Sequence, residues 1–179
     1  MIRESVTVLR NESMGHSYYR MGLACADHYR MARPGQFVMV HLAGPGVPLL
    51  ARPFSIHRPI VEAGKLTGIE VLYKVVGKCT ERMARLTTGD RLDLLGPLGR
   101  GFRISGDDSR IFLVSGGIGV APMVFLAAAL SKGKAGPAGC TVFLGGRTGD
   151  DVLCREIFTT LGMETVISTD DGSAGEHAW

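Results

Sequence analysis

The sequence predicts a protein of class β plus α/β: a six-stranded antiparallel β-barrel followed by a Rossmann-like domain built on a parallel sheet. Three observations support this prediction. Short alternating stretches separated by Gly, Pro and Asn recur through the first hundred residues. Residues 111–130 have the pattern of a buried strand, a glycine-rich turn and a helix. Beyond residue 110, strand-like and helix-like segments alternate. We therefore expect a first domain at 1–102 and a second at 103–179.

Six stretches in the first domain are expected to form the strands of the barrel. They are residues 6–9, 18–24, 36–42, 54–57, 68–76 and 91–95. Six strands are enough to close a small barrel. A helix is expected at 80–86, between the last two strands, because this segment begins with the capping residue Thr80 and ends shortly before Gly89.

The second domain shows the alternation of a parallel sheet with crossover helices. We expect strands at 110–114, 140–144 and 165–168, and helices at 121–130 and 151–161. Residues 105–109 form a polar linker in this interpretation, and 131–139 form a loop.

Composition excludes several classes of protein. Hydrophobic residues make up 45% of the 179 residues, which is enough for a buried core. The net charge is only +3, and basic and acidic residues are interleaved, so the sequence gives little support to a nucleic-acid partner. Residues 111–130 carry no charge, but the glycines and proline within them favour strand, turn and helix over a membrane span.

The cysteines and histidines show no metal-ligand spacing, so no metal site is expected. The cysteines are Cys25, Cys79, Cys140 and Cys154, and the histidines are His16, His28, His41, His57 and His177. The N-terminus lacks the apolar run of a signal peptide. These features predict a cytoplasmic location with free thiols.

The first candidate site consists of Arg52, Pro53, Phe54 and Ser55 in a strand-like context. A flavin nucleotide needs its pyrophosphate neutralised and its ring N5 edge supplied with hydrogen bonds. Arg52 can fork onto phosphate oxygens. Pro53 lets the strand bend so that Ser55 faces the ring, which makes Ser55 the candidate catalytic residue, as a hydrogen-bond donor on the N5 side. An ordinary edge-strand entry remains the alternative from these four residues alone.

A second candidate element runs from a strand through Gly77 into the beginning of a helix. Backbone N–H groups and the helix dipole favour an anion at such a position, which indicates a second phosphate-binding element. Tyr73 can pack on a flavin or an adenine, and core packing is the alternative for this residue.

The third candidate is the turn after the strand at 111–114. Gly116, Gly117 and Gly119 allow a close backbone approach, and a phosphate would lie over Gly117 and Gly119 before a helix whose first turn contains Pro122. The segment departs from the G-x-G-x-x-G fingerprint, and no acidic residue can be assigned to the ribose, so NAD and NADP are not distinguished. A tight turn of any α/β domain is the alternative.

Together, five segments resemble the ferredoxin-reductase-like flavoproteins nearly from end to end. They are residues 52–56, 72–80, 95–99, 116–122 and 169–173. Within that superfamily, the sequence is most similar to the electron transfer subunits of NAD-dependent dihydroorotate dehydrogenase. The resemblance implies an FAD-binding barrel, an NAD-binding α/β domain and a C-terminal loop whose cysteines hold a [2Fe–2S] cluster.

The resemblance also implies roles for individual residues. FAD would contact Arg52, Pro53, Phe54, Ser55, Leu72, Tyr73, Lys74, Gly77, Cys79 and Thr80. The nicotinamide nucleotide would be approached by Gly116, Gly117, Gly119, Ala121 and Pro122.

Two departures from the family pattern lead to further expectations. Cys79 stands where the family has Gly, and its Cβ would weaken FAD binding if the backbone needs a positive φ there. The chain also ends six residues after Ser173, where the family continues with further strands, a helix and the cluster cysteines. We therefore expect an incomplete NAD-binding domain, no cluster ligands, and an exposed edge at the strand 111–114, so that the chain is a fragment or is completed by a partner.

These expectations lead to an FAD- and NAD-dependent oxidoreductase subunit. It would move electrons between NAD and a flavin-containing partner dehydrogenase that oxidises dihydroorotate in pyrimidine biosynthesis, as part of a hetero-oligomer. Alternatives are the electron transfer subunit of an NAD(P)H–ferredoxin oxidoreductase, a sulfhydrogenase or a sulfite reductase, and a flavin-binding or assembly module without turnover. The partner and the oligomeric state are not predicted.

Overall fold

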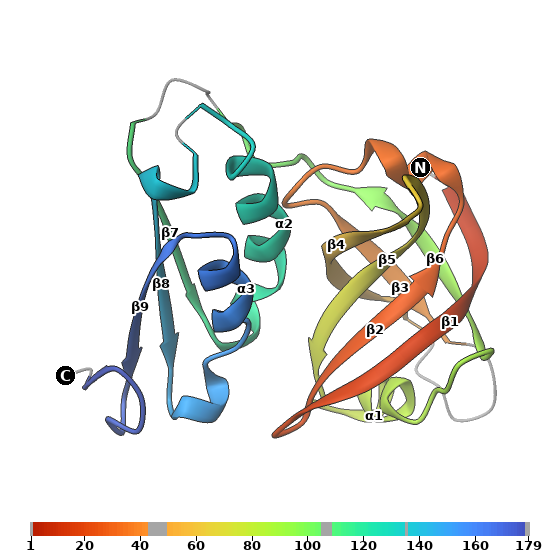
Figure 1. Cartoon of the computed structure of the whole chain (residues 1–179). Helices are drawn as coiled ribbons and strands as arrows, with labels where there is room; N and C mark the ends of the chain where they lie inside the picture. Colours follow the sequence, from red (N-terminus) through yellow and green to blue (C-terminus); the bar gives the residue numbers. More distant parts are fainter. Residues whose placement is uncertain (1, 43–49, 105–108, 135, 178–179) are drawn as a thin grey trace. The chain divides into compact units, whose positions relative to one another are not determined.

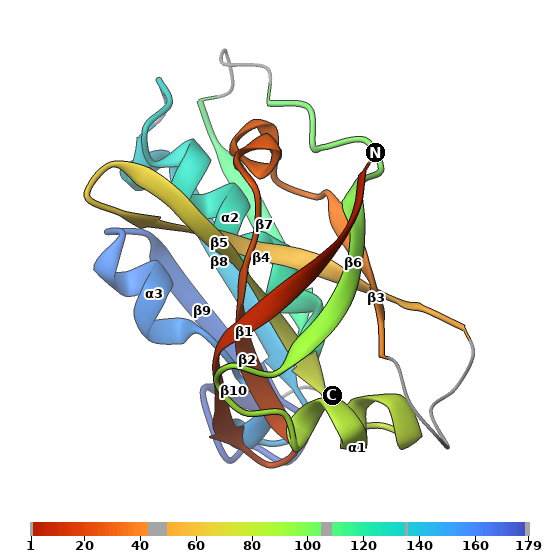
Figure 2. The same ribbon diagram turned by 90° about the vertical axis from the view of Figure 1, so that its right-hand side faces the viewer.

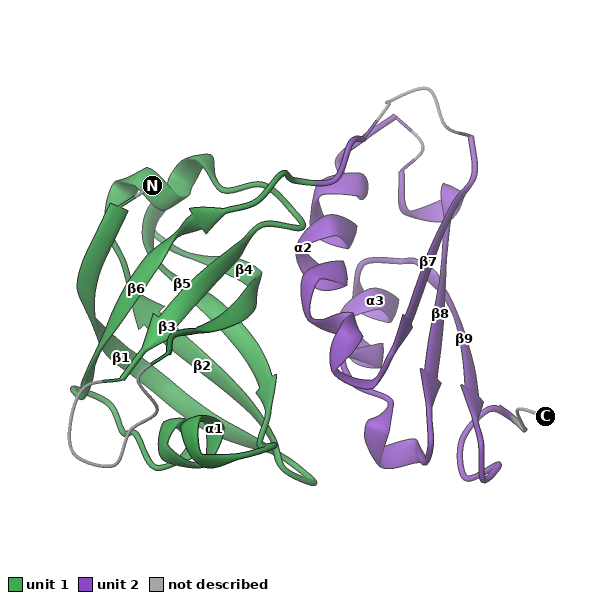
Figure 3. Cartoon of the chain, turned by 180° about the vertical axis from the view of Figure 1, so that it is seen from behind, with its two compact units in different colours: residues 1–101 green, residues 102–179 purple. Residues whose placement is uncertain are grey.

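The chain forms two compact units, Met1–Gly101 and Phe102–Trp179 (Figure 3). The computed structural model describes residues 2–42, 50–104, 109–134 and 136–177. Residues 105–108 of the expected linker lie outside the described residues.

The first unit is a closed six-stranded barrel with the strand order β1-β2-β5-β4-β3-β6 (Figures 1 and 2). Its strands are β1 (Ile2–Gly15), β2 (Tyr18–Ala24), β3 (Phe37–His41), β4 (Arg52–Glu62), β5 (Lys65–Lys74) and β6 (Arg91–Leu98). All neighbouring strands pair antiparallel. The predicted antiparallel barrel is confirmed, and each of its strands pairs with a neighbour on both sides over at least part of its length.

Two barrel strands, β1 and β4, exceed their predicted lengths by the most. β1 spans 14 residues where the sequence indicated only 6–9. Its second half is polar or exposed and shows no apolar alternation, but it remains extended because Arg10–Ser13 pair with Tyr19–Gly22 of β2. β4 begins at Arg52 and runs to Glu62, so the first candidate motif lies in the strand itself.

The barrel interior is filled by alternating aliphatic side chains. Val6, Met21, Val38, Ile56 and Leu94 are at most 3% exposed. The short helix α1 (Lys78–Ala84) lies at one end of the barrel and the 3-10 helix η1 (Asp27–Met31) lies at the other (Figure 2). The predicted helix at 80–86 is therefore present, two residues earlier than expected.

The second unit contains a parallel sheet of three strands, with a two-residue fourth strand at one edge in the order β10-β9-β8-β7. Its strands are β7 (Ile111–Gly116), β8 (Cys140–Gly146), β9 (Glu164–Thr169) and β10 (Glu176–His177). Its helices are η2 (Gly117–Val120), α2 (Ala121–Leu130), η3 (Pro137–Gly139), η4 (Gly149–Asp151) and α3 (Arg155–Thr160). The predicted Rossmann-like alternation is confirmed.

The predicted helix at 151–161 was too long. Only residues 155–160 form α3, and residues 149–151 form the separate 3-10 helix η4. Cys154 separates η4 from α3, because its backbone is left-handed with a φ of 62°. The residue before it, Leu153, is buried. Periodicity alone could not reveal this break, because tertiary packing determines it. None of the helices within the described ranges is long and apolar enough to cross a membrane.

Candidate functional site

The β4–β5 ladder ends at Ile56, the residue directly after the first candidate motif. The pairing runs from Glu62 with Lys65 up to Ile56 with Val71. Residues 52–55 of β4 and 72–74 of β5 lie beyond this last pair, although each segment still pairs on its other side, with β3 and β2 respectively. Two strand edges thus face each other without pairing in that ladder, and their backbone groups can accept another hydrogen-bonding partner.

The side chains at this end of the ladder differ in their exposure and in their contacts. Ser55 is half-buried, and its hydroxyl has no hydrogen-bond partner within the described part of the chain. The rings of Phe54 and Tyr73 meet edge to face at 5.9 Å between centroids, across the gap between the two strands. Pro53 is exposed. The ladder end therefore exposes part of Ser55 and of the Phe54 ring.

Tyr73 and its neighbours in β5 are packed into the barrel. Tyr73 is 1% exposed, its ring stacks on Tyr19 at 5.6 Å, and its hydroxyl donates to Asn11 Oδ1 at 3.0 Å. Leu72 is also buried. Lys74 Nζ donates to the Tyr18 hydroxyl at 2.9 Å and lies 4.5 Å from the centre of the Tyr18 ring. The Tyr73 ring thus has the core-packing environment that the sequence left as an alternative.

Arg52 connects the ladder end to the first turn of α1. Its Nη1 donates to the carbonyl oxygens of Leu50 and Ala51 at 3.2 and 3.4 Å. Burial raises the pKa of the Cys79 thiol, and the nearby positive charge of Arg52 offsets part of that rise. The structure thus brings together a cation and a helix N-terminus that the sequence identified separately.

Thr80 fixes the entry into α1. Its hydroxyl accepts hydrogen bonds from the backbone N–H groups of Val76 and Gly77 at 2.9 and 3.2 Å, and donates to the Gly77 carbonyl at 2.9 Å. Gly77 is the N-cap residue, with an extended φ of 169°. The N–H groups of Val76 and Gly77 are therefore used within the chain, and the first turn of α1 provides the remaining donors.

The strain expected at Cys79 does not occur. Cys79 is the second residue of α1 and has helical backbone geometry, so it needs no positive φ and its Cβ carries no such cost. The side chain is 8% exposed. The condition on which weaker FAD binding was expected, a positive φ at Cys79, is therefore not met.

Sequence reasoning missed a buried ionic cluster next to the ladder end. Glu70 is fully buried, and it accepts hydrogen bonds from Arg10 Nη2 at 2.6 Å, from Arg10 Nε at 3.2 Å and from Arg58 Nε. Arg20 Nε lies 3.8 Å away. Burial by itself would raise the pKa of Glu70, but the hydrogen bonds and charges of Arg58 and Arg10 outweigh it and lower that pKa. The cluster joins β1, β2, β4 and β5.

Asn11 is a second residue that the sequence did not identify. Its Nδ2 donates to the carbonyls of Met83 and Leu86 at 2.8 and 2.9 Å, at the C-terminal end of α1. Because its Oδ1 also accepts from Tyr73, Asn11 fixes α1 relative to β5. The partners are more than sixty residues away in the chain, so no local pattern reveals them.

In the second unit, the predicted glycine turn lies between β7 and α2. Gly116 ends β7, Gly117 has a left-handed φ of 49°, and Pro122 occupies the first turn of α2. A Cβ placed on Gly119 would meet no atom within 4 Å. The fold itself therefore does not require glycine at 119, whereas a ligand that approaches the backbone does.

The loops after β8 and β9 are hydrogen-bonded to each other at the carboxyl end of the same sheet. Asp171 Oδ1 accepts from the Ser173 amide and hydroxyl at 2.9 and 2.6 Å, and Ser173 Oγ accepts from the Gly149 amide at 2.7 Å. Ligands of open α/β sheets bind beyond the carboxyl ends of the strands. The position expected for a nucleotide thus contains residues 116, 117, 119, 121 and 122. At the same end of the sheet, a hydrogen bond joins the loops after β8 and β9.

The candidate residues therefore form two groups, one in each unit. Within each group the structure brings the predicted residues to one end of one sheet. Among the described residues, no group of three or more His, Cys, Asp or Glu side chains could hold a metal ion.

Comparison with known families agrees with this arrangement. Residues 113–167 match the family model "Oxidoreductase NAD-binding domain". The chain is 43% identical over 157 residues to the dihydroorotate dehydrogenase B (NAD⁺) electron transfer subunit of Desulforamulus reducens, covering 88% of this chain and 58% of the relative. It is 39% identical over 177 residues to the corresponding subunit of Geobacillus kaustophilus, covering 97% and 65%. The chain thus spans about three-fifths of the length of these relatives.

Solved structures show the same fold. The structure of an NADH-dependent reduced ferredoxin–NADP oxidoreductase superposes with a TM-score of 0.80 at 26% identity, covering 96% of this chain and 59% of that one. The FAD/NAD-binding domain of nitric oxide dioxygenase from Vibrio cholerae gives a TM-score of 0.78 at 17% identity, covering 98% and 78%. The predicted ferredoxin-reductase-like fold is confirmed.

Proposed function

This chain belongs to the ferredoxin-reductase-like flavoproteins and is a homologue of dihydroorotate dehydrogenase B electron transfer subunits, and from this premise we propose that it moves electrons between NAD(H) and a partner dehydrogenase through FAD. The first unit would hold FAD and the second would hold the nicotinamide nucleotide. FAD, when bound, supplies a two-electron acceptor for a hydride from NADH.

The end of the β4–β5 ladder is the observation that carries this proposal. A flavin ring has hydrogen-bonding atoms along its edge and flat apolar faces. The unpaired strand edges at 52–55 and 72–74 would supply hydrogen bonds, and the Phe54 ring would supply apolar contact. Ser55 would donate a hydrogen bond at the N5 side, where its hydroxyl has no competing partner within the described chain.

The phosphates of FAD fit the surroundings of Arg52. Arg52 would neutralise the pyrophosphate together with the first turn of α1, because its charge already acts on Cys79 in that turn. Gly77 and Thr80 would hold the turn in place through the three hydrogen bonds of the Thr80 hydroxyl. Leu72, Tyr73 and Lys74 would contribute mainly their backbone, since the Leu72 and Tyr73 side chains are buried and the Lys74 ammonium is bound to Tyr18.

The nicotinamide nucleotide would approach the turn after β7. Gly116, Gly117 and Gly119 would let its phosphates reach the backbone. Ala121 and Pro122 would line this approach at the start of α2 without donating to the phosphates, because the Ala121 N–H donates to the Ile118 carbonyl and Pro122 has no N–H. The work of these residues is binding and orientation, which brings the hydride donor to the acceptor without a side-chain acid or base.

We further propose a partner subunit that oxidises dihydroorotate in a hetero-oligomer with this chain, because the relatives are named as electron transfer subunits of a dihydroorotate dehydrogenase. We also propose that this partner carries its own flavin and that the complex lies in the cytoplasm. All four cysteines are free, which suits a reducing compartment. Ferredoxin as the electron partner is the second candidate, favoured by the similarity to the ferredoxin–NADP oxidoreductase structure.

An anaerobic absorbance spectrum of the purified chain, before and after addition of NADH, tests the proposal. Flavin bands that bleach support it. Flavin bands that persist support a flavin-binding module without turnover. Absence of flavin after incubation with FAD contradicts the assignment of the ladder end.

Arg52→Ala tests the phosphate contact. We expect FAD to dissociate at least tenfold more readily, because one charge-assisted hydrogen-bonding group is worth about 1.5–3 kcal/mol. Arg91→Ala is the control, since Arg91 is exposed and, among the described residues, its guanidinium donates only to Ser5. Equal FAD affinity in the two variants, with both barrels folded, would show that Arg52 is not the phosphate anchor.

A further inference from the structure

Ser115 is a polar residue in an otherwise aliphatic row of the second unit's sheet. It pairs with Leu144 of β8, and Leu144 pairs with Ile167 of β9. Leu144 and Ile167 are 3% and 8% exposed. Paired residues of neighbouring strands project their side chains to the same face of a sheet. The Ser115 side chain therefore lies on the face where Leu144 and Ile167 are buried.

Helices α2 and α3 cover that face of β7, β8 and β9 (Figures 1 and 3). The neighbours of Ser115 in β7 agree with this placement. Leu113, two residues earlier, is 4% exposed, whereas Val114, on the other face, is 69% exposed. Ser115 is followed directly by Gly116 and by the turn that leads into α2. Its side chain thus lies on the helix-covered face, at the end of β7 where the nucleotide is expected.

The hydroxyl of Ser115 is buried without a partner. Its Oγ forms no hydrogen bond with any residue that the structure describes. Thr169, at the same end of β9, is different, because its hydroxyl donates to the Ala174 carbonyl and accepts from the Ala174 amide. A buried hydroxyl that lacks a hydrogen bond costs stability, and such groups are rare in folded proteins. The Ser115 hydroxyl therefore has a capacity for hydrogen bonding that the described fold does not use.

The strand positions directly after this hydroxyl carry no side chains. Gly116 ends β7, and Gly145 pairs with it in β8. A Cβ on Gly116 would lie 3.7 Å from the Gly145 carbonyl oxygen, and one on Gly145 would lie 3.8 Å from the Ser115 carbonyl oxygen. These are ordinary contact distances, so packing alone does not require glycine at either position. The two glycines let a ligand approach the carboxyl ends of the strands, and Ser115 supplies the last side chain of β7 before them.

We propose that the Ser115 hydroxyl donates a hydrogen bond to a phosphate oxygen of the nicotinamide nucleotide. This inference rests on the proposed function and deepens it, because it adds a side chain to the backbone approach at Gly117 and Gly119. A serine hydroxyl turns about its Cα–Cβ bond between staggered positions, so it can point toward the end of the strand. Phosphate oxygens are charged acceptors, which form stronger hydrogen bonds than neutral ribose and carboxamide groups do. The contact thus gives the Ser115 hydroxyl its missing partner when the nucleotide binds.

Titration calorimetry with NAD⁺ tests this contact. The wild type and Ser115→Ala are both loaded with FAD, and the dissociation constant of NAD⁺ is measured for each. We expect binding by Ser115→Ala to be weaker by about tenfold or more, because a hydrogen bond to a charged group is lost. An affinity within about twofold of that of the wild type overturns the proposal.

The stability of the second unit without nucleotide separates this role from a structural one. Hydrogen exchange of residues 140–146 is followed by mass spectrometry. Ser115→Ala removes a hydroxyl that has no partner in the described chain, so protection should equal that of the wild type or exceed it. Ser131→Ala is the matched control, because the Ser131 hydroxyl donates to the Ala128 carbonyl at 3.1 Å. This control should lose protection and keep its NAD⁺ affinity. If Ser115→Ala loses as much protection as Ser131→Ala, its hydroxyl supports the fold and the proposal is overturned.

The same titrations distinguish this inference from the proposed function. If the wild type binds NAD⁺ and Ser115→Ala binds it equally well, only this inference fails. If the wild type with bound FAD binds no NAD⁺, the proposed function fails and this inference fails with it. Loss of NAD⁺ affinity in Ser115→Ala, with bound FAD and undiminished protection, supports both.

Discussion

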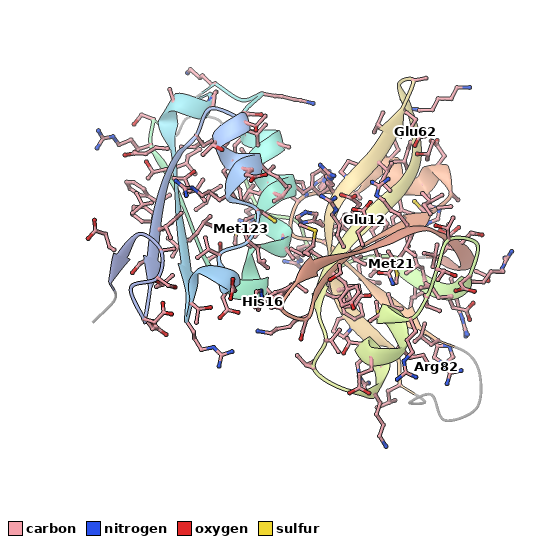
Figure 4. All side chains as sticks on the ribbon, turned by 60° about the horizontal axis from the view of Figure 1, so that its bottom comes forward. Glu12, His16, Met21, Glu62, Arg82 and Met123 are labelled. Carbon is pink, nitrogen blue, oxygen red and sulfur yellow. The ribbon has the colours of Figure 1, made fainter. Side chains whose placement is uncertain are left out.

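Replacing Glu70 with Gln should destabilise the barrel strongly. Glu70 is fully buried and holds guanidinium groups from three strands. Glutamine has nearly the same shape but no charge, so Arg10 and Arg58 would lose the carboxylate that they share, and Arg20 would keep only its pair with Glu12. Glu12→Gln is the matched control, because Glu12 (Figure 4) is 46% exposed and pairs with Arg20 at 2.7 Å.

The structure sets the expected size of the effect. Breaking a buried ion pair costs about 3–5 kcal/mol when the remaining charge stays buried. Here the remaining charges belong to Arg10, Arg20 and Arg58, whose side chains are 35%, 25% and 39% exposed, so water compensates part of the loss. We expect about 3 kcal/mol for Glu70→Gln, and less than about 1 kcal/mol for Glu12→Gln because that pair is at the surface.

Urea unfolding followed by near-ultraviolet circular dichroism measures this difference. All four tyrosines, Tyr18, Tyr19, Tyr29 and Tyr73, lie in the barrel unit, so their signal reports that unit. If the two variants differ from each other by less than about 0.5 kcal/mol, which is within the usual range for surface substitutions, the cluster does not hold the strands together and the reasoning is refuted.

The pH dependence provides a second readout of the same group. The folded state lowers the pKa of Glu70 below its ordinary value of 4.5, so the unfolded chain binds this proton first as the pH falls. The stabilisation is therefore complete above pH 4.5 and is lost as the pH falls through the lowered pKa. The stability difference between the wild type and Glu70→Gln should shrink over this range, and a constant difference down to pH 3 would contradict the assignment.

Two further predictions concern other parts of the chain. Thr169→Val should destabilise the second unit by about 2 kcal/mol, because Thr169 is fully buried and its hydroxyl donates to the Ala174 carbonyl and accepts from the Ala174 amide. Hydrogen exchange of residues 140–146 followed by mass spectrometry measures this, and protection equal to that of the wild type would contradict it. Burial and the charge of Glu4 raise the pKa of the Cys25 thiol to about 12, so iodoacetamide at pH 8 should modify Cys25 quickly only after denaturation. Peptide mapping by mass spectrometry measures the modification. Rapid modification of the native chain would show that the thiol is not protected.

Local patterns were sufficient to predict the elements that carry the candidate residues. The alternation around Arg52 and Phe54 predicted a strand, and the glycines at 116, 117 and 119 predicted the turn before α2. These features depend on residues adjacent in the chain, and backbone geometry there is set by local sterics. The same reasoning failed at Cys154, because a left-handed cysteine is a costly conformation that only the packing of the finished fold imposes.

Contacts between distant residues could not be predicted in this way. Glu70 lies sixty residues from Arg10 in the chain, and they meet because Arg10 pairs with Gly22 in β1–β2 and Gly22 pairs with Glu70 in β2–β5. The absence of a side chain at Gly22 lets Arg10 reach across, since a Cβ there would lie 3.1 Å from Arg10 Cγ. Strand register determines this contact, and register follows from the whole barrel rather than from any one segment.

The buried cluster and the open ladder end are connected features of one sheet. Arg58 and Glu70 pair directly in the β4–β5 ladder, next to its last pair, Ile56 and Val71. Where β4 and β5 separate, their backbone groups lose their partners in that ladder. Such unpaired edges weaken a barrel, because the strands can then slip in register. The Arg58–Glu70 ion pair holds the two strands together just before a shift in register, beyond which only Ile56 and Val71 still pair. The separation can then persist as a defined slot, in which a flat ring with hydrogen-bonding edges replaces the missing strand partner for 52–55 and 72–74.

On this reasoning Glu70→Gln should also weaken FAD binding although Glu70 touches no candidate cofactor residue, whereas Glu12→Gln should leave FAD binding unchanged.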